Sequence, residues 1–282
     1  MLTDYHLHLR PDERSATPET HFTAANAERY REVASERGIE ELGVSEHVYR
    51  FRDALSVWRH PLWQEFARDD LESYCEFVRT ETDLRLGVEA DFVPGTEDRM
   101  ANLLEAHDFD YVVGSVHFLR DEALDMEQYG IWKAGRSAEK IWRRYFETLA
   151  EAARSGLFDI LAHPDLVKIW GPAHPERPRP EGDLRRYYEP AVEAIAESGI
   201  AVEVSTAGLR KPAQEIYPAP ELLEMCIEAG APIALSSDAH RPEDIGADYE
   251  RALALLERTG VQELCVFERR TRRLEPLGAG VR

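Results

Sequence analysis

Short apolar runs bounded by polar residues or glycine recur along the chain, and longer amphipathic segments separate them. Apolar runs of this length predict buried β-strands, whereas apolar residues at helical spacing predict helices between them. Seven strands alternating with helices imply parallel strands joined by right-handed crossovers, a pattern that fits a barrel and a doubly wound sheet equally well. The predicted strands are Leu2–His6, Glu41–Ser45, Leu84–Glu89, Tyr111–Val116, Asp159–Ala162, Ala201–Val204 and Pro232–Ser236.

The clearest helical pattern covers Ser137–Arg154, behind a serine of the type that caps helix N-termini. Asp183–Glu197 and Glu243–Arg258 have the same periodicity. We expect Phe118–Lys133 to form a long loop. No linker rich in Gly, Ser or Pro divides the chain. We therefore expect residues 1–282 to form a single domain, which is a size that α/β barrels commonly have.

Composition narrows the classes of function. The chain of 282 residues has a net charge of −20, which argues against non-specific nucleic-acid binding. It contains no apolar run long enough to span a membrane and no basic and then apolar leader. Its three cysteines are far apart and lack metal-site spacing, as expected of reduced thiols in a cytoplasmic protein.

Histidine and carboxylate residues gather where the predicted strands end. His6 and His8 alternate with Tyr5, Leu7 and Leu9, so an extended backbone would project both imidazoles to one side. The carboxyl ends of parallel strands meet on one face of an α/β fold, and a crowd of imidazoles there is hard to satisfy without metal. The other residues at or just after predicted strand ends are His47, Glu89, His117, His163, Asp238 and His240.

This ordered series of motifs resembles the PHP (polymerase and histidinol phosphatase) family of metallophosphoesterases, over Asp4 to about Gly246. The segments Glu203–Pro212 and Glu215–Pro218, followed by Ser237–His240, are similar to the histidinol-phosphate phosphatases within that family. Phe92–Gly95 and Gly114–Phe118 indicate the same branch. The resemblance implies a distorted (β/α)7 TIM-like barrel and a phosphomonoesterase that acts on L-histidinol phosphate in histidine biosynthesis.

The resemblance also implies two to three divalent metal ions, usually Zn, Mn or Fe, which suit mixed imidazole and carboxylate ligands. Such ions lower the pKa of a bound water and offset phosphoryl charge. Carried over residue by residue, one ion would be held by His6, His8, Glu89 and Asp238. Glu89 would share a second ion with His117 and His163, and the third would be held by His47 and His240.

The chain departs from the family pattern just after the first motif. Many relatives have a further histidine there, where this sequence reads Leu9-Arg10-Pro11-Asp12-Glu13-Arg14. Asp12 could replace that histidine as an oxygen ligand of the third ion, with Glu13 and His21 as further candidates.

The remaining chemistry rests on residues near the same strand ends. Arg210 and Lys211 follow the sixth predicted strand and are the candidates for contacts with phosphate. Asp238 or His240 could relay a proton to the leaving group. The acidic loop Asp121–Glu127 could face a cationic substrate, but we interpret it as a solvated charge run.

Two other functions compete with a small-molecule phosphatase. A phosphoesterase acting on nucleotides or short oligonucleotides would need a basic groove, and the dense basic cluster of Arg269, Arg270, Arg272 and Arg273 lies far from the strand-end motifs. A non-catalytic metal-binding module would be expected to lose ligands that this chain retains. The sequence says nothing of the oligomeric state.

Overall fold

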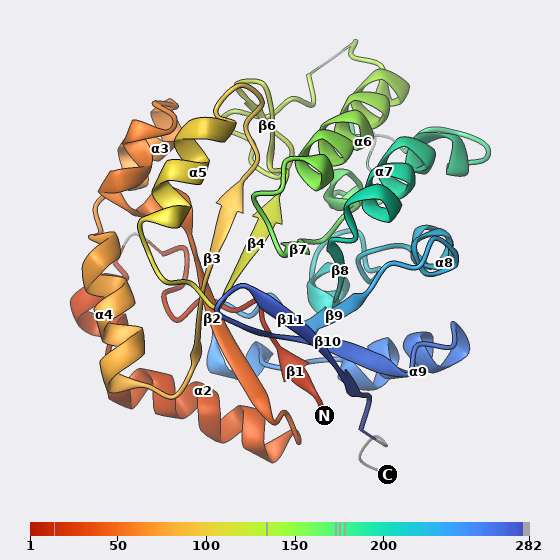
Figure 1. Ribbon diagram of the computed structural model, residues 1–282. Coiled ribbons are helices and arrows are strands. Elements are labelled where there is room, and N and C mark those ends of the chain that lie inside the picture. Colours follow the sequence, from red (N-terminus) through yellow and green to blue (C-terminus); the bar gives the residue numbers. More distant parts are fainter. Residues whose placement is uncertain (14, 134, 173, 175, 178, 279–282) are drawn as a thin grey trace.

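Seven parallel strands form a nearly closed barrel in the computed structural model, which describes residues 1–13, 15–133, 135–172, 174, 176, 177 and 179–278 (Figure 1). Their order is β1-β2-β3-β4-β7-β8-β9. A parallel bridge between Leu7 and Ala239 brings the two edges together, with the His8 amide donating to the Ala239 carbonyl at 2.7 Å. The barrel alternative is therefore confirmed. The strands are β1 (Thr3–Asp4), β2 (Glu41–His47), β3 (Arg85–Asp91), β4 (Tyr111–Ser115), β7 (Ile160–Leu161), β8 (Ala201–Ser205) and β9 (Ile233–Ser236).

Helices surround the barrel, with α2 to α5 on one side and α6 to α9 on the other in the view of Figure 1. The α-helices are α1 (Pro18–His21), α2 (Ala24–Glu36), α3 (Pro61–Phe66), α4 (Leu71–Glu81), α5 (Glu97–Glu105), α6 (Ala138–Arg154), α7 (Arg185–Ser198), α8 (Pro220–Glu228) and α9 (Tyr249–Arg258). Short 3₁₀ segments are η1 (Val48–Arg50), η2 (Arg52–Ser56), η3 (Leu166–Lys168), η4 (Thr206–Arg210) and η5 (Pro242–Asp244).

Two of the three predicted helices match the structure closely, and the third was predicted too long. Helix α6 begins directly after Ser137, whose hydroxyl accepts a hydrogen bond from the Lys140 amide. Helix α9 begins at Tyr249 rather than at residue 243. The reason is local backbone conformation, because Gly246 and Asp248 have left-handed φ angles of +62° and +59° that a helix cannot contain.

The segment between residues 118 and 133 is more ordered than the predicted loop. It contains a small antiparallel hairpin, β5 (Phe118–Leu119) and β6 (Glu122–Ala123), and its side chains Leu124 and Ile131 are buried. Apolar residues therefore anchor this connection over the barrel.

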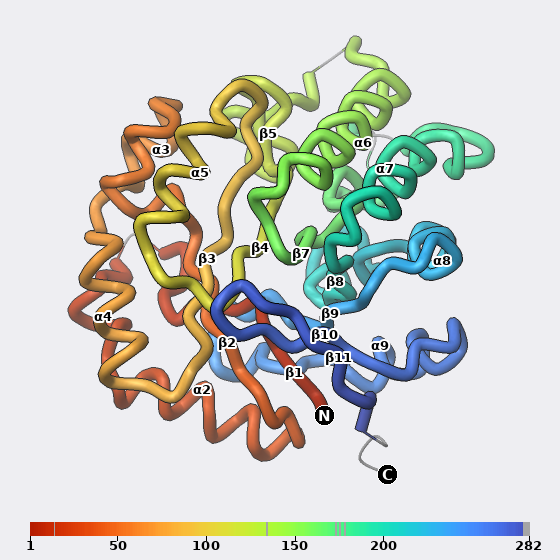
Figure 2. Tube along the Cα trace, viewed as in Figure 1, coloured from red at the N-terminus to blue at the C-terminus, as the bar shows by residue number. Residues whose placement is uncertain are grey.

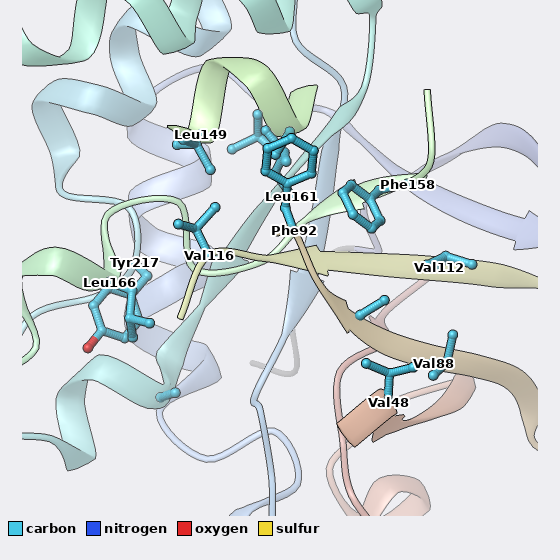
Figure 3. Close-up of a cluster of buried hydrophobic side chains, with 14 of the residues drawn as sticks. Val48, Val88, Phe92, Val112, Val116, Leu149, Phe158, Leu161, Leu166 and Tyr217 are labelled. Atoms are coloured by element: carbon cyan, nitrogen blue, oxygen red, sulfur yellow. The ribbon is translucent and has the colours of Figure 1, made fainter. Parts of the chain in front are cut away.

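Most of the hydrophobic core lies between the strands and the helices around them. Figure 3 shows part of this layer, in which Val88 of β3 and Val112 of β4 contribute to the same cluster as Leu149 of α6. Phe92 and Phe158 pack edge to face there, with ring centroids 6.3 Å apart. This layer fixes the strands, and hence their carboxyl ends, against the helices.

A second, smaller cluster fills the barrel interior at the amino ends of the strands. Tyr5 and Tyr111 meet there at 4.9 Å between ring centroids. A β-carbon on Gly43 or Gly87 would lie within 2.5 or 2.3 Å of the Tyr111 side chain, so these two positions require glycine for close approach.

A C-terminal hairpin closes this end of the barrel, and the sequence pattern did not predict it. It consists of β10 (Glu263–Glu268) and β11 (Thr271–Pro276), and Figure 2 shows it crossing the amino ends of the strands. Phe267 packs on Tyr5 at 5.4 Å between centroids, and the Met1 ammonium donates to the Pro276 carbonyl at 2.6 Å. The basic cluster predicted to be a solvated surface lies on this hairpin and its turn.

Two sequence expectations concern the whole chain. The cysteines Cys75, Cys226 and Cys265 are all free and buried. In the part of the chain that the structure describes, none of the helices combines the length and the apolar character that crossing a membrane requires.

Candidate active site

The predicted metal ligands converge at the carboxyl ends of the strands, with Glu89 of β3 at the centre. Glu89 Oε1 lies 3.3 Å from His163 Nε2 and 3.5 Å from His117 Nε2. Its other oxygen, Oε2, lies 3.4 Å from His6 Nε2 and 3.6 Å from His8 Nε2. His47 Nδ1 also lies 2.5 Å from Oε2. The two oxygens of one carboxylate thus face two different sets of imidazoles, which is the arrangement that a bridging ligand requires.

Asp238, beyond the end of β9, faces the same first pair from the other side. Its Oδ1 lies 3.7 Å from His6 Nε2, 3.5 Å from His8 Nε2 and 3.6 Å from His240 Nδ1. His8 also stacks on His47, with ring centroids 4.1 Å apart, and lies 4.3 Å from the His240 ring. The eight ligands predicted from strand ends therefore all reach one site.

Among the described residues, three groups of side chains offer ligand atoms within 4.8 Å of one another. His6 belongs to two of these groups, and so does His8. The groups are His6, His8 and Asp238; His6, Glu89 and His163; and His8, His47 and His240.

Several polar atoms of this cluster are fully buried and have no hydrogen-bond partner in the part of the chain that the structure describes. They include both ring nitrogens of His8, Glu89 Oε1 and His6 Nε2. Leaving such groups unpaired is costly in a protein interior. Convergent imidazole nitrogens and carboxylate oxygens in this state fit divalent ions such as Zn, Mn or Fe.

Two buried carboxylates orient the candidate ligands, and sequence analysis missed the role of both. His6 Nδ1 bonds to Glu203 Oε1 at 2.8 Å, and His117 Nδ1 bonds to Asp91 Oδ1 at 2.7 Å. In each case the bond leaves Nε2 pointing at Glu89, as is typical of metal-bound histidines. The sequence did contain a signal for Asp91, because it lies two residues after Glu89 and so on the same face of β3.

Of the three candidates for the extra ligand of the third ion, Asp12 is the one that lies beside His47 and His240. Its Oδ2 lies 3.1 Å from His240 Nε2, and its Oδ1 lies 3.9 Å from His47 Nε2. Glu13 instead pairs with Arg241 at 2.7 Å, and His21 bonds within its own helical turn.

A buried arginine holds Asp12 in this place. Arg50 donates to both Asp12 and Glu46, and Glu46 is completely buried beside His8. The guanidinium therefore offsets the negative charge of the Asp12 carboxylate.

Two of the candidate ligands have a backbone conformation that favours glycine. His163 has a φ of +25° and Asp238 a φ of +50°. Non-glycine residues rarely adopt positive φ, and such strain concentrates at functional sites. The two residues follow strands β7 and β9, where the chain turns sharply into the site.

The carboxylates of the cluster are ionised at neutral pH. Burial opposes the charge of Glu89, but the imidazoles of His47, His6 and His117 outweigh it and hold the pKa of Glu89 well below its usual value. Burial opposes the charge of Asp238, but the charges of His6, His240 and His8 outweigh it and hold the pKa of Asp238 well below its usual value. Anionic ligands of this kind attract divalent cations.

A pocket opens over the cluster, and its lining combines candidate metal ligands with a largely apolar wall. Lys211 lines this pocket. Arg210 donates instead to the Ser237 carbonyl at 2.5 Å, and its Nη1 is buried without a partner among the described residues. The wall consists of Tyr49, Phe118, Met126, Leu166, Ile169 and Tyr217.

Comparison with known proteins identifies the class to which this barrel and site belong. Residues 6–207 match the PHP domain, and the chain belongs to the PHP domain family. A probable histidinol-phosphatase of Deinococcus radiodurans is 35% identical over 254 residues, which is 89% of this chain and 91% of that protein. The histidinol-phosphatase of Bacillus subtilis is 26% identical, over 82% of this chain and 91% of its own.

Solved structures agree on the fold. Histidinol phosphate phosphatase from Lactococcus lactis, solved with Zn, L-histidinol and phosphate, superposes with a TM-score of 0.68 at 19% identity. The superposition covers 96% of this chain and 98% of that one. A putative histidinol phosphatase from Listeria monocytogenes gives a TM-score of 0.67 at 18% identity, over 88% and 99% of the two chains. The predicted PHP-type barrel is thereby confirmed.

Proposed function

We propose that the protein is a metal-dependent phosphatase that hydrolyses L-histidinol phosphate to L-histidinol and phosphate, as in histidine biosynthesis. The observation that carries the proposal is the buried cluster around Glu89, in which imidazoles and carboxylates converge beside a pocket that suits a small-molecule substrate. Relatives named histidinol-phosphatase, one of them 35% identical over 89% of the chain, support this substrate.

The proposed metal site contains two to three ions of Zn, Mn or Fe. His6, His8, Glu89 and Asp238 would hold the first; Glu89, His117 and His163 the second; and Asp12, His47 and His240 the third. When bound, such ions supply a water of lowered pKa and positive charge for the phosphoryl oxygens. The opposed directions of the two Glu89 oxygens support its bridging role.

Other side chains would act on the substrate itself. Lys211, which lines the pocket, would contribute a point charge to the phosphate. Arg210 would contribute through its unpaired Nη1, while its other contacts hold the loop that carries Asp238. Asp238 or His240 would pass a proton to the leaving alkoxide, because both lie at the boundary of the cluster and the pocket.

The nucleotide alternative finds less support in this geometry. Among the described residues that line the pocket, Lys211 is the sole Lys or Arg, whereas a groove for a polynucleotide needs a series of cations. The basic C-terminal hairpin lies at the opposite, amino end of the strands. Arg270, for instance, donates to the Leu157 carbonyl just before β7.

The test is phosphate release by the metal-reconstituted protein from L-histidinol phosphate, a mononucleotide and an unspecific aryl phosphate. We expect kcat/KM to be much higher for L-histidinol phosphate. An Asp238→Asn variant purified in parallel controls for contaminating phosphatases. Activity on the nucleotide alone would overturn the substrate, and the absence of activity from a metal-loaded protein would favour the non-catalytic module.

A further inference from the structure

One carboxylate in the pocket wall has no role in the metal cluster. Asp125, in the loop after β6, lines the same pocket as His117 and His163. Its Oδ1 is fully buried and has no hydrogen-bond partner among the described residues, and Asp125 belongs to none of the groups with metal-ligand geometry. A desolvated carboxylate oxygen without a partner is unfavourable unless a ligand satisfies it.

The acidic loop around Asp125 is otherwise what the sequence interpretation expected. Asp121 and Glu127 are exposed, and Glu122 pairs with Lys133 and Arg136 near the surface. Asp125 is the exception, because its side chain is half-buried and turned into the pocket. Only this member of the loop therefore contradicts the interpretation as a solvated charge run.

The backbone before Asp125 is held firmly. The carbonyl of Leu124 accepts hydrogen bonds from two indoles, Trp132 Nε1 at 3.0 Å and Trp170 Nε1 at 2.7 Å. The Leu124 amide donates to the His117 carbonyl at 2.9 Å. Anchors from three separate segments fix the carboxylate in place, as a preorganised binding group requires.

The end of the loop is also tied to Trp170. Arg177 lies over the Trp170 ring, 3.6 Å from its centroid, and pairs with Glu127 at 3.2 Å. The indole that bonds to Leu124 thus forms part of a clamp around residues 124–127.

We propose that Asp125 determines specificity by binding the primary ammonium group of the substrate. The inference rests on the proposed function, since L-histidinol phosphate carries its amine on the carbon next to the ester CH₂. Asp125 lines the pocket that opens over the metal cluster, together with Phe118 and Met126, so its carboxylate would be available to the amine once the phosphate is at the ions. The amine is charged at neutral pH, whereas an unperturbed imidazole is mostly neutral, so the carboxylate favours the amine.

The test compares L-histidinol phosphate with 3-(imidazol-4-yl)propyl phosphate, which has the same alkyl ester and imidazole but no amine. Wild-type protein should prefer the aminated substrate by about tenfold to a hundredfold in kcat/KM, as expected for a hydrogen bond between charged groups. Asp125→Asn should remove most of this preference, chiefly through KM. Asp121→Asn is the matched control in the same loop and should keep the wild-type preference.

A binding measurement gives a second readout. Calorimetry of L-histidinol with the metal-loaded protein and inorganic phosphate should show weaker binding to Asp125→Asn than to Asp121→Asn. An equal loss of kcat/KM on both esters in Asp125→Asn, or an unchanged preference in that variant, would overturn the role of Asp125 but leave the proposed function intact. Inactivity of the wild-type protein on L-histidinol phosphate would overturn the proposed function, and this inference with it.

Discussion

Glu89 faces His6 and His8 with one oxygen and His117 and His163 with the other, and its replacement should therefore remove metal as well as activity. Glu89→Gln keeps the size of the side chain but replaces the carboxylate by a neutral amide. One of the two oxygens, either the one that faces His117 and His163 or the one that faces His6, is then lost as a ligand. We expect activity to fall by more than the roughly 10- to 100-fold typical of a residue that only orients a ligand. Metal analysis should show the loss of more than one ion per chain.

The exposed Glu105 on α5 provides the matched control, and Glu105→Gln should retain both metal and turnover. Near-normal activity in Glu89→Gln would remove the bridging role. A loss of activity with full metal content would mean that Glu89 acts on the substrate and not through the ions.

Glu46 gives a pH-dependent prediction at the same scale. Burial raises the pKa of this carboxyl, but the charges of Arg50 and His8 outweigh burial and lower it to about 2, from an ordinary 4.5. A lowered pKa in the folded state means that the ionised form stabilises the fold above the unfolded pKa. This contribution is lost as the pH falls from about 4.5 towards 2.

Glu46→Gln should therefore lower the free energy of unfolding at pH 7 by about 3 kcal/mol. The difference from wild type should shrink as the pH is lowered through 4.5. Urea unfolding in the presence of a chelator at pH 7, 5, 4 and 3 measures the loss of stability and its dependence on pH. Glu105→Gln is the control variant and should be as stable as wild type at each pH. A difference that stays constant with pH would contradict the linkage.

At the scale of elements, the C-terminal hairpin should be needed for stability but not for chemistry. Phe267 of β10 is buried against Tyr5 and Tyr111, whereas Leu274 of β11 is exposed to 47%. Phe267→Ala should lower the free energy of unfolding by about 3–5 kcal/mol, and Leu274→Ala by less than about 1 kcal/mol. Both variants should keep wild-type kcat well below their melting temperatures, because the hairpin lies at the end of the barrel away from the candidate metal ligands.

The periodicity of the sequence predicted elements best where an element is apolar. All seven barrel strands were found because their outward residues are buried under helices. The hairpin strand β11 was missed because it is polar and largely exposed, so nothing in Thr271–Pro276 marks a strand. The start of α9 was misplaced because the charged residues after Arg241 fit a helical surface as well as they fit a loop.

The site was predictable where it depended on position along a strand, and not where it depended on neighbours. His117 and His163 follow strands and could be assigned from that alone. Glu203 could not be paired with His6, nor Arg50 with Asp12, because those contacts depend on which strands and turns lie side by side in the barrel. Asp125 was predicted as part of a solvated run, since sequence does not show which acid of a loop turns inward.

At the scale of the whole molecule, the chain has a net charge of −20, and the carboxylates of the candidate metal cluster are themselves ionised. Such a field attracts divalent cations and repels a phosphate ester until the cations are bound. The expectation of one domain over residues 1–282 stays a prediction, although the continuous barrel and its closing hairpin suit it. Because the ionised cluster attracts cations, we expect bound metal to affect stability as well as activity.

Removal of metal should destabilise the protein, because buried polar atoms of His6, His8 and Glu89 have no hydrogen-bond partner among the described residues and would lose the ion that satisfies them. Adding Zn, Mn or Fe(II) to chelator-treated protein should raise Tm by roughly 5 °C or more at a free metal concentration near 100 times Kd. Ca, which prefers oxygen ligands, should raise it much less. Scanning calorimetry with each ion, on wild type and on Glu89→Gln, measures the effect. An equal response to Ca, or a full response of Glu89→Gln to Zn, would mean that the stabilising ion binds outside the imidazole cluster.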